Sequence, residues 1–314
     1  MSKVAFLFPG QGAQYVGMGQ ELAQTEPIVR EHVEQANDLL GFDLARLCWE
    51  GPEEELKLTA NQQPAILTLS VAVLRLLERA GIKADLVAGL SLGEYSAHVA
   101  AGTLTFAQAV PLVRQRGQLM QEAVPAGTGG MAAILGLDTE RVDQICAETR
   151  DASGTWVAGA NYNCPGQIVI AGQEEALAEA HERVVAAGGR YVRLSVTAPF
   201  HSRLLQPAAD RLAPVLDQVE LQMPQIPVIS NVTAEPVESL ATIRPLLVQQ
   251  VAAPVLWERT IRLMLAAGVT QFIEVGPGKT LASFLKKIDR KATCHSVDDS
   301  QSLARLLDSI GREC

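Results

Sequence analysis

The chain has 314 residues, of which 48% are hydrophobic, and its formal net charge at pH 7 is −9. A chain of this length and apolar content can bury a large core, so we expect one large domain that can carry a smaller one. The acidic balance argues against nucleic acid as the main partner, because phosphate binding needs a basic surface.

The first half of the chain alternates apolar runs with helical patterns. No stretch approaches the roughly 18 uninterrupted apolar residues of a membrane span, and the first apolar run, Val4 to Phe8, is too short for the core of a signal peptide. We therefore expect a cytoplasmic protein that does not enter a membrane. The predicted elements are strands at Lys3 to Phe8 and Leu86 to Ala88 and helices at Ile66 to Ala80, Ser91 to Ala101 and Phe106 to Glu122. This alternation predicts a mostly parallel sheet with helices on both faces.

The order of predicted strands and helices changes between residues 128 and 197. The predicted elements there are a strand at 130–137, a helix at 138–150, strands at 155–162 and 167–172 joined by a turn at 163–166, a helix at 174–189 and a strand at 190–196. Their order, β-α-β-β-α-β, is typical of a ferredoxin-like module. We predict that residues 128–197 form a subdomain inserted into a large α/β domain made of residues 1–127 and 198–314, to which strands at 226–231 and 271–276 also belong.

The five cysteines, at positions 48, 146, 164, 294 and 314, are scattered without a CxxC pair. An odd count in a large core predicts reduced thiols and argues against a disulfide framework or a zinc site. Cys146 shares the apolar stripe of the predicted helix at 138–150, so we interpret it as a small buried hydrophobe.

A serine between two glycines, Gly89-Leu90-Ser91-Leu92-Gly93, follows a predicted strand and precedes a predicted helix. This is the pattern of a nucleophile elbow, a strained turn that tolerates no side chains two positions either side of the serine. The turn presents the hydroxyl at a helix N-terminus, where backbone N–H groups stabilise an oxyanion. The alternative is a serine that only caps its helix.

A serine nucleophile needs a base, and five histidines are available. His98 lies on the same helix as Ser91 but about 10 Å along its axis, too far for a hydrogen bond. His32 and His181 fall among charged neighbours in helical patterns. Two arrangements stay open: a hydrolase-like order of Ser91, an acid and His295, and a direct pair of Ser91 with His201, which lies in a loop at the predicted domain junction. The acid of the first arrangement is Asp217 or Glu274.

Several segments, in order and over nearly the whole chain, resemble the malonyl-CoA:acyl-carrier-protein transacylase family and the related acyltransferase domains of fatty-acid and polyketide synthases. They are "FLFPGQGAQYVGMG" (6–19), "GLSLGEYSA" (89–97), "RQRGQLMQEAVPAGTGGMAAILG" (114–136), "NYNCPGQIVIAG" (161–172), "APFHS" (198–202), "QQVAAPVLW" (249–257) and "EVGPGKTLASFLKK" (274–287). The family fold, a hydrolase-like α/β domain with an inserted ferredoxin-like domain, agrees with the organisation predicted above.

The resemblance implies a role for individual residues. Ser91 becomes the nucleophile and His201 its base, with no acidic third member, because backbone carbonyls near Gln250 orient the imidazole in relatives. Gln11 stands beside an oxyanion hole to which the backbone N–H of Leu92 contributes. Without the resemblance, the "PGQG" loop would be a tight turn and Gln250 a helix-terminal residue that caps a backbone group.

The resemblance also implies which acyl group is transferred. Arg116 grips the malonyl carboxylate, since a guanidinium matches a carboxylate with two parallel hydrogen bonds; by itself the pattern predicts only an arginine on a helix surface. Phe200, just before the histidine, favours malonyl over methylmalonyl groups. Many relatives have histidine where Leu90 stands here, so a hydrogen bond from that side chain is absent.

The implied substrates are malonyl-CoA and the phosphopantetheine thiol of acyl carrier protein in fatty-acid biosynthesis, with no metal or other cofactor, and we expect a monomer. Carrier proteins are acidic, so an acidic enzyme needs a local basic patch to bind one. Lys286, Lys287 and Arg290 are the proposed patch, although they also suit a solvated helix end. The alternatives are an acyltransferase that serves a polyketide synthase, an acyl-thioester hydrolase and a non-catalytic acyl-binding scaffold.

Overall fold

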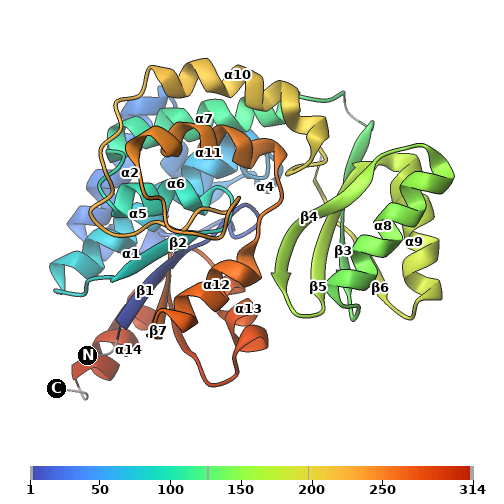
Figure 1. Ribbon diagram of the computed structural model, residues 1–314. Coiled ribbons are helices and arrows are strands. Elements are labelled where there is room, and N and C mark those ends of the chain that lie inside the picture. The colour runs from blue at the N-terminus through green and yellow to red at the C-terminus, as the bar shows by residue number, and fades with distance from the viewer. Residues whose placement is uncertain (1–2, 126, 197, 312–314) are drawn as a thin grey trace.

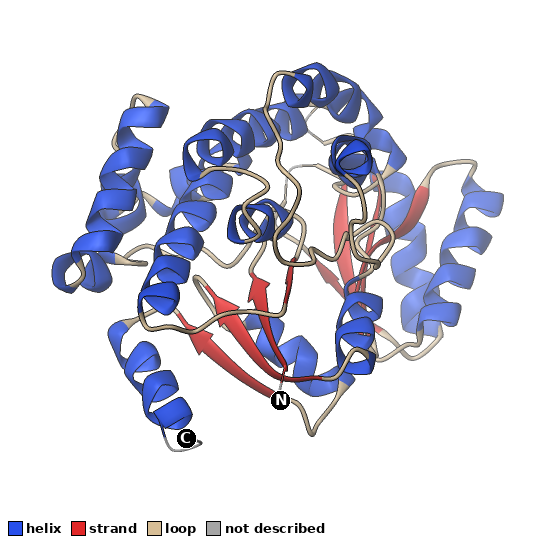
Figure 2. Cartoon of the chain, turned by 60° about the vertical axis from the view of Figure 1, so that its left-hand side comes forward, coloured by secondary structure: helices blue, strands red, loops and turns tan. Residues whose placement is uncertain are grey.

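The computed structural model describes residues 3–125, 127–196 and 198–311, so Cys314 lies outside the described residues. The chain forms two separate four-stranded sheets, with helices packed around the first sheet and against one side of the second (Figures 1 and 2). Within the described ranges, none of the helices combines the length and the apolar character that a membrane crossing requires.

The first sheet is wholly parallel, with the strand order β2-β1-β7-β8. Its strands are β1 (Lys3–Phe8), β2 (Leu86–Gly89), β7 (Val269–Val275) and β8 (Thr293–Val297). Successive side chains of a strand point to opposite faces, and β1 shows this directly: Phe6 and Phe8 join one buried cluster, whereas Ala5 and Leu7 join another. Both faces of the sheet are therefore covered, which confirms the predicted α/β class.

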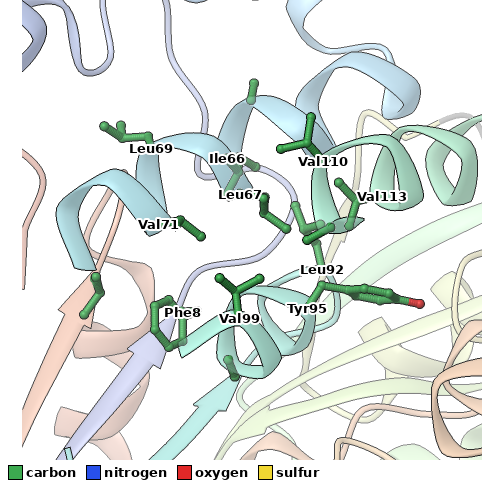
Figure 3. Close-up of a cluster of buried hydrophobic side chains, with 14 of the residues drawn as sticks. Phe8, Ile66, Leu67, Leu69, Val71, Leu92, Tyr95, Val99, Val110 and Val113 are labelled. Carbon is green, nitrogen blue, oxygen red and sulfur yellow. The ribbon is translucent and has the colours of Figure 1, made fainter. Parts of the chain in front are cut away.

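One face is covered by α5 (Thr59–Arg79) and α6 (Gly93–Ala100), and α7 (Phe106–Glu122) packs against these two helices. Figure 3 shows their apolar side chains meeting above Phe8 of β1, with Leu67, Val99 and Val113 in the same cluster. The opposite face packs against α12 (Trp257–Ala266) and α13 (Thr280–Ile288), whose buried side chains include Trp257 and Phe284. The remaining helices of this part are α1 (Gln20–Thr25), α2 (Pro27–Leu40), α3 (Leu44–Glu50), α4 (Glu53–Leu56), α10 (Gln206–Asp217), α11 (Leu240–Ala252) and α14 (Ser300–Gly311), with a 3₁₀ turn at Arg203–Leu205.

The second sheet lies within residues 129–193 and is antiparallel, with the strand order β4-β5-β3-β6. Its strands are β3 (Gly129–Leu135), β4 (Val157–Cys164), β5 (Gln167–Gln173) and β6 (Arg190–Arg193), and its helices are α8 (Thr139–Ser153) and α9 (Glu174–Ala186). The chain order β3-α8-β4-β5-α9-β6 is the ferredoxin-like order predicted from the sequence.

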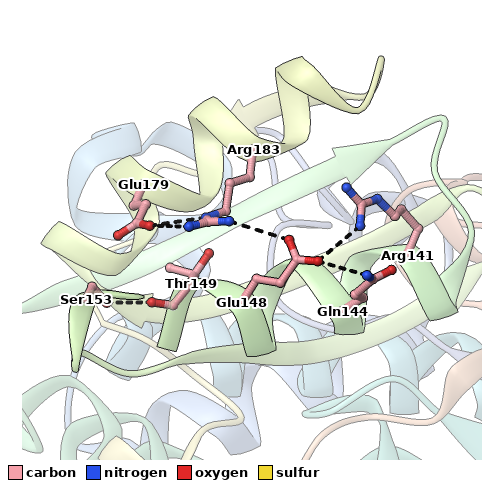
Figure 4. Close-up of polar contacts among 7 residues, drawn as sticks. All are labelled: Arg141, Gln144, Glu148, Thr149, Ser153, Glu179 and Arg183. Atoms are coloured by element: carbon pink, nitrogen blue, oxygen red, sulfur yellow. Dashed lines mark hydrogen bonds and ion pairs between the residues drawn. The ribbon is translucent and has the colours of Figure 1, made fainter. Parts of the chain in front are cut away.

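The helices α8 and α9 cover the face of this sheet that points away from the large domain (Figure 1). Val142, Ile145 and Cys146 are buried between α8 and the sheet, as their spacing predicts. On the outer side, Glu148 of α8 bridges Arg141 and Arg183, the second of which belongs to α9 (Figure 4). Such half-exposed pairs contribute about 0–1 kcal/mol each, so burial of apolar side chains holds the two helices in place.

Some boundaries differ from the sequence prediction for identifiable reasons. Helix α5 begins at Thr59, before the predicted Ile66, although Pro64 lies inside it. A proline cannot donate to the carbonyl four residues earlier, and here the Ala60 carbonyl accepts a hydrogen bond from Arg114 Nη1 at 2.8 Å instead. The polar first turns of α5 gave no apolar period from which to place its start.

One predicted strand is absent from the sheet, and one strand of the sheet was not predicted. Residues 226–231 do not form a strand of the sheet: they make a single parallel bridge from Val228 to Val87 of β2, because the chain turns immediately afterwards, where Ala234 N bonds to Ser230 O at 2.9 Å. Strand β8 was missed, since its sequence, TCHSV, mixes polar and apolar residues. The predicted strand at 190–196 ends at Arg193, and the predicted helix at 174–189 ends at Ala186.

Candidate active site

Ser91 lies in the turn between β2 and α6 with a φ of 53°, outside the helix that the sequence predicted to begin there. This left-handed conformation is costly for a residue other than glycine. The flanking glycines are required by close approach of the backbone. A Cβ at Gly89 would lie 1.9 Å from the carbonyl carbon of Gly93, and a Cβ at Gly93 would lie 2.1 Å from Phe8 O. The GxSxG pattern therefore forms the sharp turn that a nucleophile elbow needs.

Asn231 holds the elbow from a distant segment, and the sequence analysis did not identify it. Its Oδ1 accepts a hydrogen bond from Ser91 N at 2.6 Å, and its Nδ2 donates to Gly89 O at 2.7 Å. The side chain thus bonds to the residues on each side of Leu90, at the start of the turn. The only sequence signal was an asparagine at the end of a predicted strand, which is too common to single out.

His201 faces Ser91 from the loop before the 3₁₀ turn. Its Nε2 lies 2.7 Å from Ser91 Oγ, and its Nδ1 lies 2.9 Å from Gln250 O. A carbonyl can only accept, so Nδ1 carries the hydrogen and Nε2 is free to accept the serine proton. Burial, aided by the charge of Arg116, lowers the pKa of His201 to about 4. The imidazole is therefore neutral at pH 7 and able to act as a base.

Arg116 reaches the same hydroxyl from α7 and is 1% exposed. Its Nη2 donates to Ser91 Oγ at 3.2 Å and to Gln250 Oε1 at 2.9 Å, and its Nη1 donates to Gln63 Oε1 at 2.8 Å. The guanidinium also lies 5.3 Å from the centre of the Tyr95 ring. Burial lowers the pKa of Arg116, yet every oxygen bound to it is neutral. A buried cation with neutral partners is suited to receive an anion.

Gln63 is the second residue that sequence reasoning missed. It lies in the early part of α5, is fully buried, and its Nε2 contacts Met120 Sδ at 3.7 Å while its Oε1 binds the arginine. The signal was present as a polar "NQQP" stretch ahead of an apolar helix, but nothing in the sequence showed that this stretch is buried.

A pocket of about 260 Å³ opens in front of Ser91 and His201. Gln11 and the rest of the "PGQG" loop line one side of it, and Phe200, 4% exposed, lines another. The inserted sheet forms a further wall with Met131, Ala133 and Val169, whereas Ala132 and Ile134 point to its own core. The period of two along β3 thus separates pocket wall from core.

The structure therefore brings together most of the predicted site residues. Leu92 is buried as the residue that caps α6, and its place directly after Ser91 suits a backbone donor to an oxyanion. Gln250, at the end of α11, has no exposed surface and contacts both Arg116 and His201.

The hydrolase-like arrangement is wrong. His295 lies inside β8, paired with Ile273. Glu274 accepts hydrogen bonds from Leu281 N and Ala282 N at the start of α13, and Asp217 ends α10. His98 is buried in α6 and, within the described ranges, has no hydrogen-bond partner on either ring nitrogen. Ser91 is thus paired with His201, 110 residues further along the chain.

The basic residues at the end of α13 lie close to this pocket. Lys286, Lys287 and Arg290 are exposed and, with Pro165, line a groove of about 560 Å³. Lys287 Nζ donates to Gln167 Oε1 at 2.8 Å, and Gln167 also lines the pocket. The patch is therefore in contact with one of the residues that line the pocket.

Known proteins are similar to this chain over nearly its whole length. A family described as an acyl transferase domain matches residues 5–307. The chain is similar to the malonyl CoA-acyl carrier protein transacylase of Bacillus subtilis, with 46% identity over 100% of this chain and 99% of the relative. It is also similar to the enzyme of that name from Escherichia coli K12, with 45% identity over 98% of this chain and 100% of the relative.

Solved structures show the same likeness. A malonyl-transacylase in complex with its type II polyketide synthase acyl-carrier protein superposes with a TM-score of 0.95 and 45% identity, covering 98% of this chain and 100% of the other. A malonyl CoA-acyl carrier protein transacylase from Clostridium perfringens superposes with a TM-score of 0.96 and 43% identity, covering 99% of this chain and 98% of the other.

Proposed function

This chain belongs to the acyl transferase family, and we propose that it moves the malonyl group of malonyl-CoA to the phosphopantetheine thiol of acyl carrier protein. The observation that carries the proposal is the position of Ser91 Oγ, 2.7 Å from the acceptor nitrogen of His201 and 3.2 Å from Arg116 Nη2. One hydroxyl thus lies between a base and a cation. In a malonyl-serine ester the carboxylate carbon is three bonds from Oγ, within reach of that cation.

The first half-reaction follows from these contacts. His201 Nε2 takes the proton of Ser91 while Oγ attacks the thioester carbonyl, and backbone N–H groups at the elbow hold the oxyanion. When the intermediate collapses, the carbon–sulfur bond breaks and the leaving sulfur of coenzyme A takes the proton from Nε2. The product is a malonyl ester on Ser91, with Arg116 binding the carboxylate.

The second half-reaction runs the same steps in reverse with a different thiol. The carrier thiol gives its proton to His201 Nε2, its sulfur attacks the ester carbonyl, and Ser91 Oγ leaves and recovers the proton. This is ping-pong catalysis. The steps move protons and one acyl group and use residues of one chain, so the proposed reaction needs neither a metal or redox cofactor nor a second copy of the chain; a monomer stays a prediction. A cytoplasmic location stays a prediction.

Intact-protein mass spectrometry tests the proposal. Mixing the enzyme with malonyl-CoA should add one malonyl group, Ser91→Ala should remain unmodified, and holo carrier protein should remove the adduct and become malonylated. No adduct on the wild-type chain would favour a non-catalytic acyl-binding scaffold. An adduct that water removes as fast as the carrier does would favour a thioester hydrolase.

We further propose that Lys286, Lys287 and Arg290 bind the acidic carrier protein. The support is their exposure and their position at the pocket rim, through the contact of Lys287 with Gln167. Reversal to glutamate at Lys286 or Lys287 should raise KM for carrier protein and leave KM for malonyl-CoA unchanged. Lys83→Glu makes the same charge change before β2, at the opposite edge of the sheet. The same KM for carrier protein in the patch variants and in this control would show that the patch does not bind the carrier.

The carrier of fatty-acid biosynthesis is the partner we favour, and a polyketide carrier is the second candidate. The second is supported by the similar malonyl-transacylase that was solved with a type II polyketide synthase carrier. Measuring kcat/KM with a purified carrier of each kind distinguishes the two, since the physiological carrier should have the higher value.

A further inference from the structure

Glu94 is a carboxyl group behind the reacting side chains that the mechanism above does not use. It lies in the first turn of α6, three residues after Ser91, and has no exposed surface. Its Oε2 accepts hydrogen bonds from Gln250 Nε2 at 2.6 Å and from Asn231 N at 3.1 Å. A buried carboxyl group is costly unless something compensates for its desolvation, so its contacts need an explanation.

The contact with Gln250 decides how that amide is turned. An amide has a donating end and an accepting end, and a carboxylate oxygen only accepts. Glu94 Oε2 and Ser91 O, which accepts at 3.0 Å, therefore hold the NH₂ group together and direct Oε1 to Arg116 Nη2 at 2.9 Å; the contact with Glu94 is the shorter of the two. The main-chain carbonyl of the same glutamine accepts from His201 Nδ1. One residue thus supports both the arginine and the base, and Glu94 fixes its side chain.

The contact with Asn231 acts on the nucleophile. Glu94 Oε2 receives the Asn231 backbone N–H, while the Asn231 side chain binds Ser91 N at 2.6 Å. A single carboxylate oxygen is therefore shared by the two segments that hold the elbow and the base, 137 and 156 residues away in the chain.

We propose that Glu94 is a positioning residue, which aligns Arg116 and His201 with Ser91 by holding the Gln250 amide in one orientation. The inference rests on the proposed function, because it assigns Arg116 and His201 their roles. What matters is an acceptor oxygen at this reach, and a negative charge is not required. Burial raises the pKa of Glu94 to about 7, and a protonated carboxyl group keeps a carbonyl oxygen that accepts.

Two substitutions separate reach from charge. Glu94→Gln keeps an acceptor oxygen at the same distance and removes the charge, whereas Glu94→Asp keeps the charge and withdraws the oxygen by about 1.5 Å. Because a misplacement of 1 Å in a catalytic group can cost about 100-fold in rate, we expect E94D to lose at least about 10-fold in kcat and E94Q to stay within about threefold of wild type. E94A should lose at least as much as E94D.

Two readouts distinguish positioning from a merely structural role. The preference of E94D for malonyl-CoA over acetyl-CoA should fall, because a misplaced Gln250 no longer holds Arg116. In a Gln250→Ala background, E94D should cost little more than Gln250→Ala alone, since Glu94 acts through that side chain. Circular dichroism and Tm establish that each variant is folded, and the E94Q and E94D pair carries the test if E94A gives no folded protein.

Three results would overturn the inference. They are E94D with wild-type kcat and wild-type malonyl selectivity, E94Q as inactive as E94D, and fully additive losses in the Gln250→Ala background. Wild-type enzyme is assayed for the malonyl-serine ester in the same series. Its absence would reject the proposed function, whereas its presence together with an unaffected E94D would reject the role of Glu94 alone.

Discussion

Removing the guanidinium of Arg116 should reduce the preference for malonyl over acetyl groups by a larger factor than it reduces the intrinsic reactivity of Ser91. Arg116 Nη1 and Nη2 are already bonded to the neutral oxygens of Gln63 and Gln250 in the free site. The N–H on Nε has no hydrogen-bond partner within the described residues, so a malonyl carboxylate exchanges one neutral partner of the guanidinium and also gains a donor that an acetyl group leaves unpaired.

The magnitude follows from these contacts. The present bonds of the guanidinium to amide oxygens already involve a charged group, so their exchange for carboxylate contacts changes little. The gain is the one further bond to a charged group, about 1.5–3 kcal/mol, or about 10- to 150-fold in kcat/KM, since 1.36 kcal/mol is tenfold. We expect Arg116→Ala to lose this factor in the ratio of malonyl to acetyl kcat/KM. Arg116→Lys keeps the charge without the forked guanidinium, so its ratio of malonyl to acetyl kcat/KM should lie between those of wild type and Arg116→Ala.

The assay is the rate of serine acylation from malonyl-CoA and from acetyl-CoA, followed by quenched mass spectrometry, so that carrier binding plays no part. Tm of each variant controls for stability, because Gln63 Oε1 and Gln250 Oε1 lose a buried donor. A malonyl-to-acetyl ratio in Arg116→Ala within about threefold of wild type would refute this argument.

Three other perturbations have defined outcomes. Gly89→Ala should lower the free energy of unfolding by more than about 1–3 kcal/mol, the range typical of overpacking, because its Cβ would lie 1.9 Å from Gly93 backbone atoms. Urea unfolding measures this change, and an unchanged urea midpoint would contradict the close approach. Phe200→Ala should raise acylation by methylmalonyl-CoA relative to malonyl-CoA by about 10-fold, and an unchanged ratio would remove Phe200 from selectivity. Burial lowers the pKa of His98 to about 4, below its ordinary 6.5, so the unfolded chain binds more protons between these values. The free energy of unfolding should therefore fall by about 3 kcal/mol as pH drops from 6.5 to 4, and His201 should add a fall of the same sign. His98→Leu should remove the contribution of His98 to this fall. If the free energy of unfolding of that variant depends on pH as steeply as that of wild type, His98 does not contribute.

The fold was predictable where the period of apolar residues is clear. The runs at Lys3 to Phe8 and Phe106 to Glu122 coincide with β1 and α7 to the residue, and the order of elements within 129–193 identified the inserted sheet. The failures are places where tertiary contacts replace local signals. Helix α5 continues past Pro64 because Arg114 binds the freed carbonyl of Ala60, and no local sequence pattern predicts that contact.

The candidate site was predictable as far as its residues carry a motif. The elbow singled out Ser91, but Gly89 and Gly93 alone said nothing about which histidine is the base, and the family resemblance was needed to choose His201. Asn231, Gln63 and Glu94 could not be found, because each is a common polar residue whose importance comes from complete burial beside the elbow. Burial of a polar residue is a property of the folded chain and leaves no mark in a single sequence.

The inserted sheet and the orientation of the base are linked through the backbone. Strand β4 is joined to the segment after α11 by two hydrogen bonds, from Tyr162 N to Val255 O at 2.9 Å and from Val255 N to Ala160 O at 2.8 Å. Gln250, whose carbonyl fixes the His201 ring, lies five residues before Val255. His201 itself has a φ of 57°, a strained conformation that persists only where the surroundings hold it. The sheet that forms one wall of the pocket is therefore also attached to the support of the base, so a shift of the inserted module would change the pocket and the alignment of His201 together.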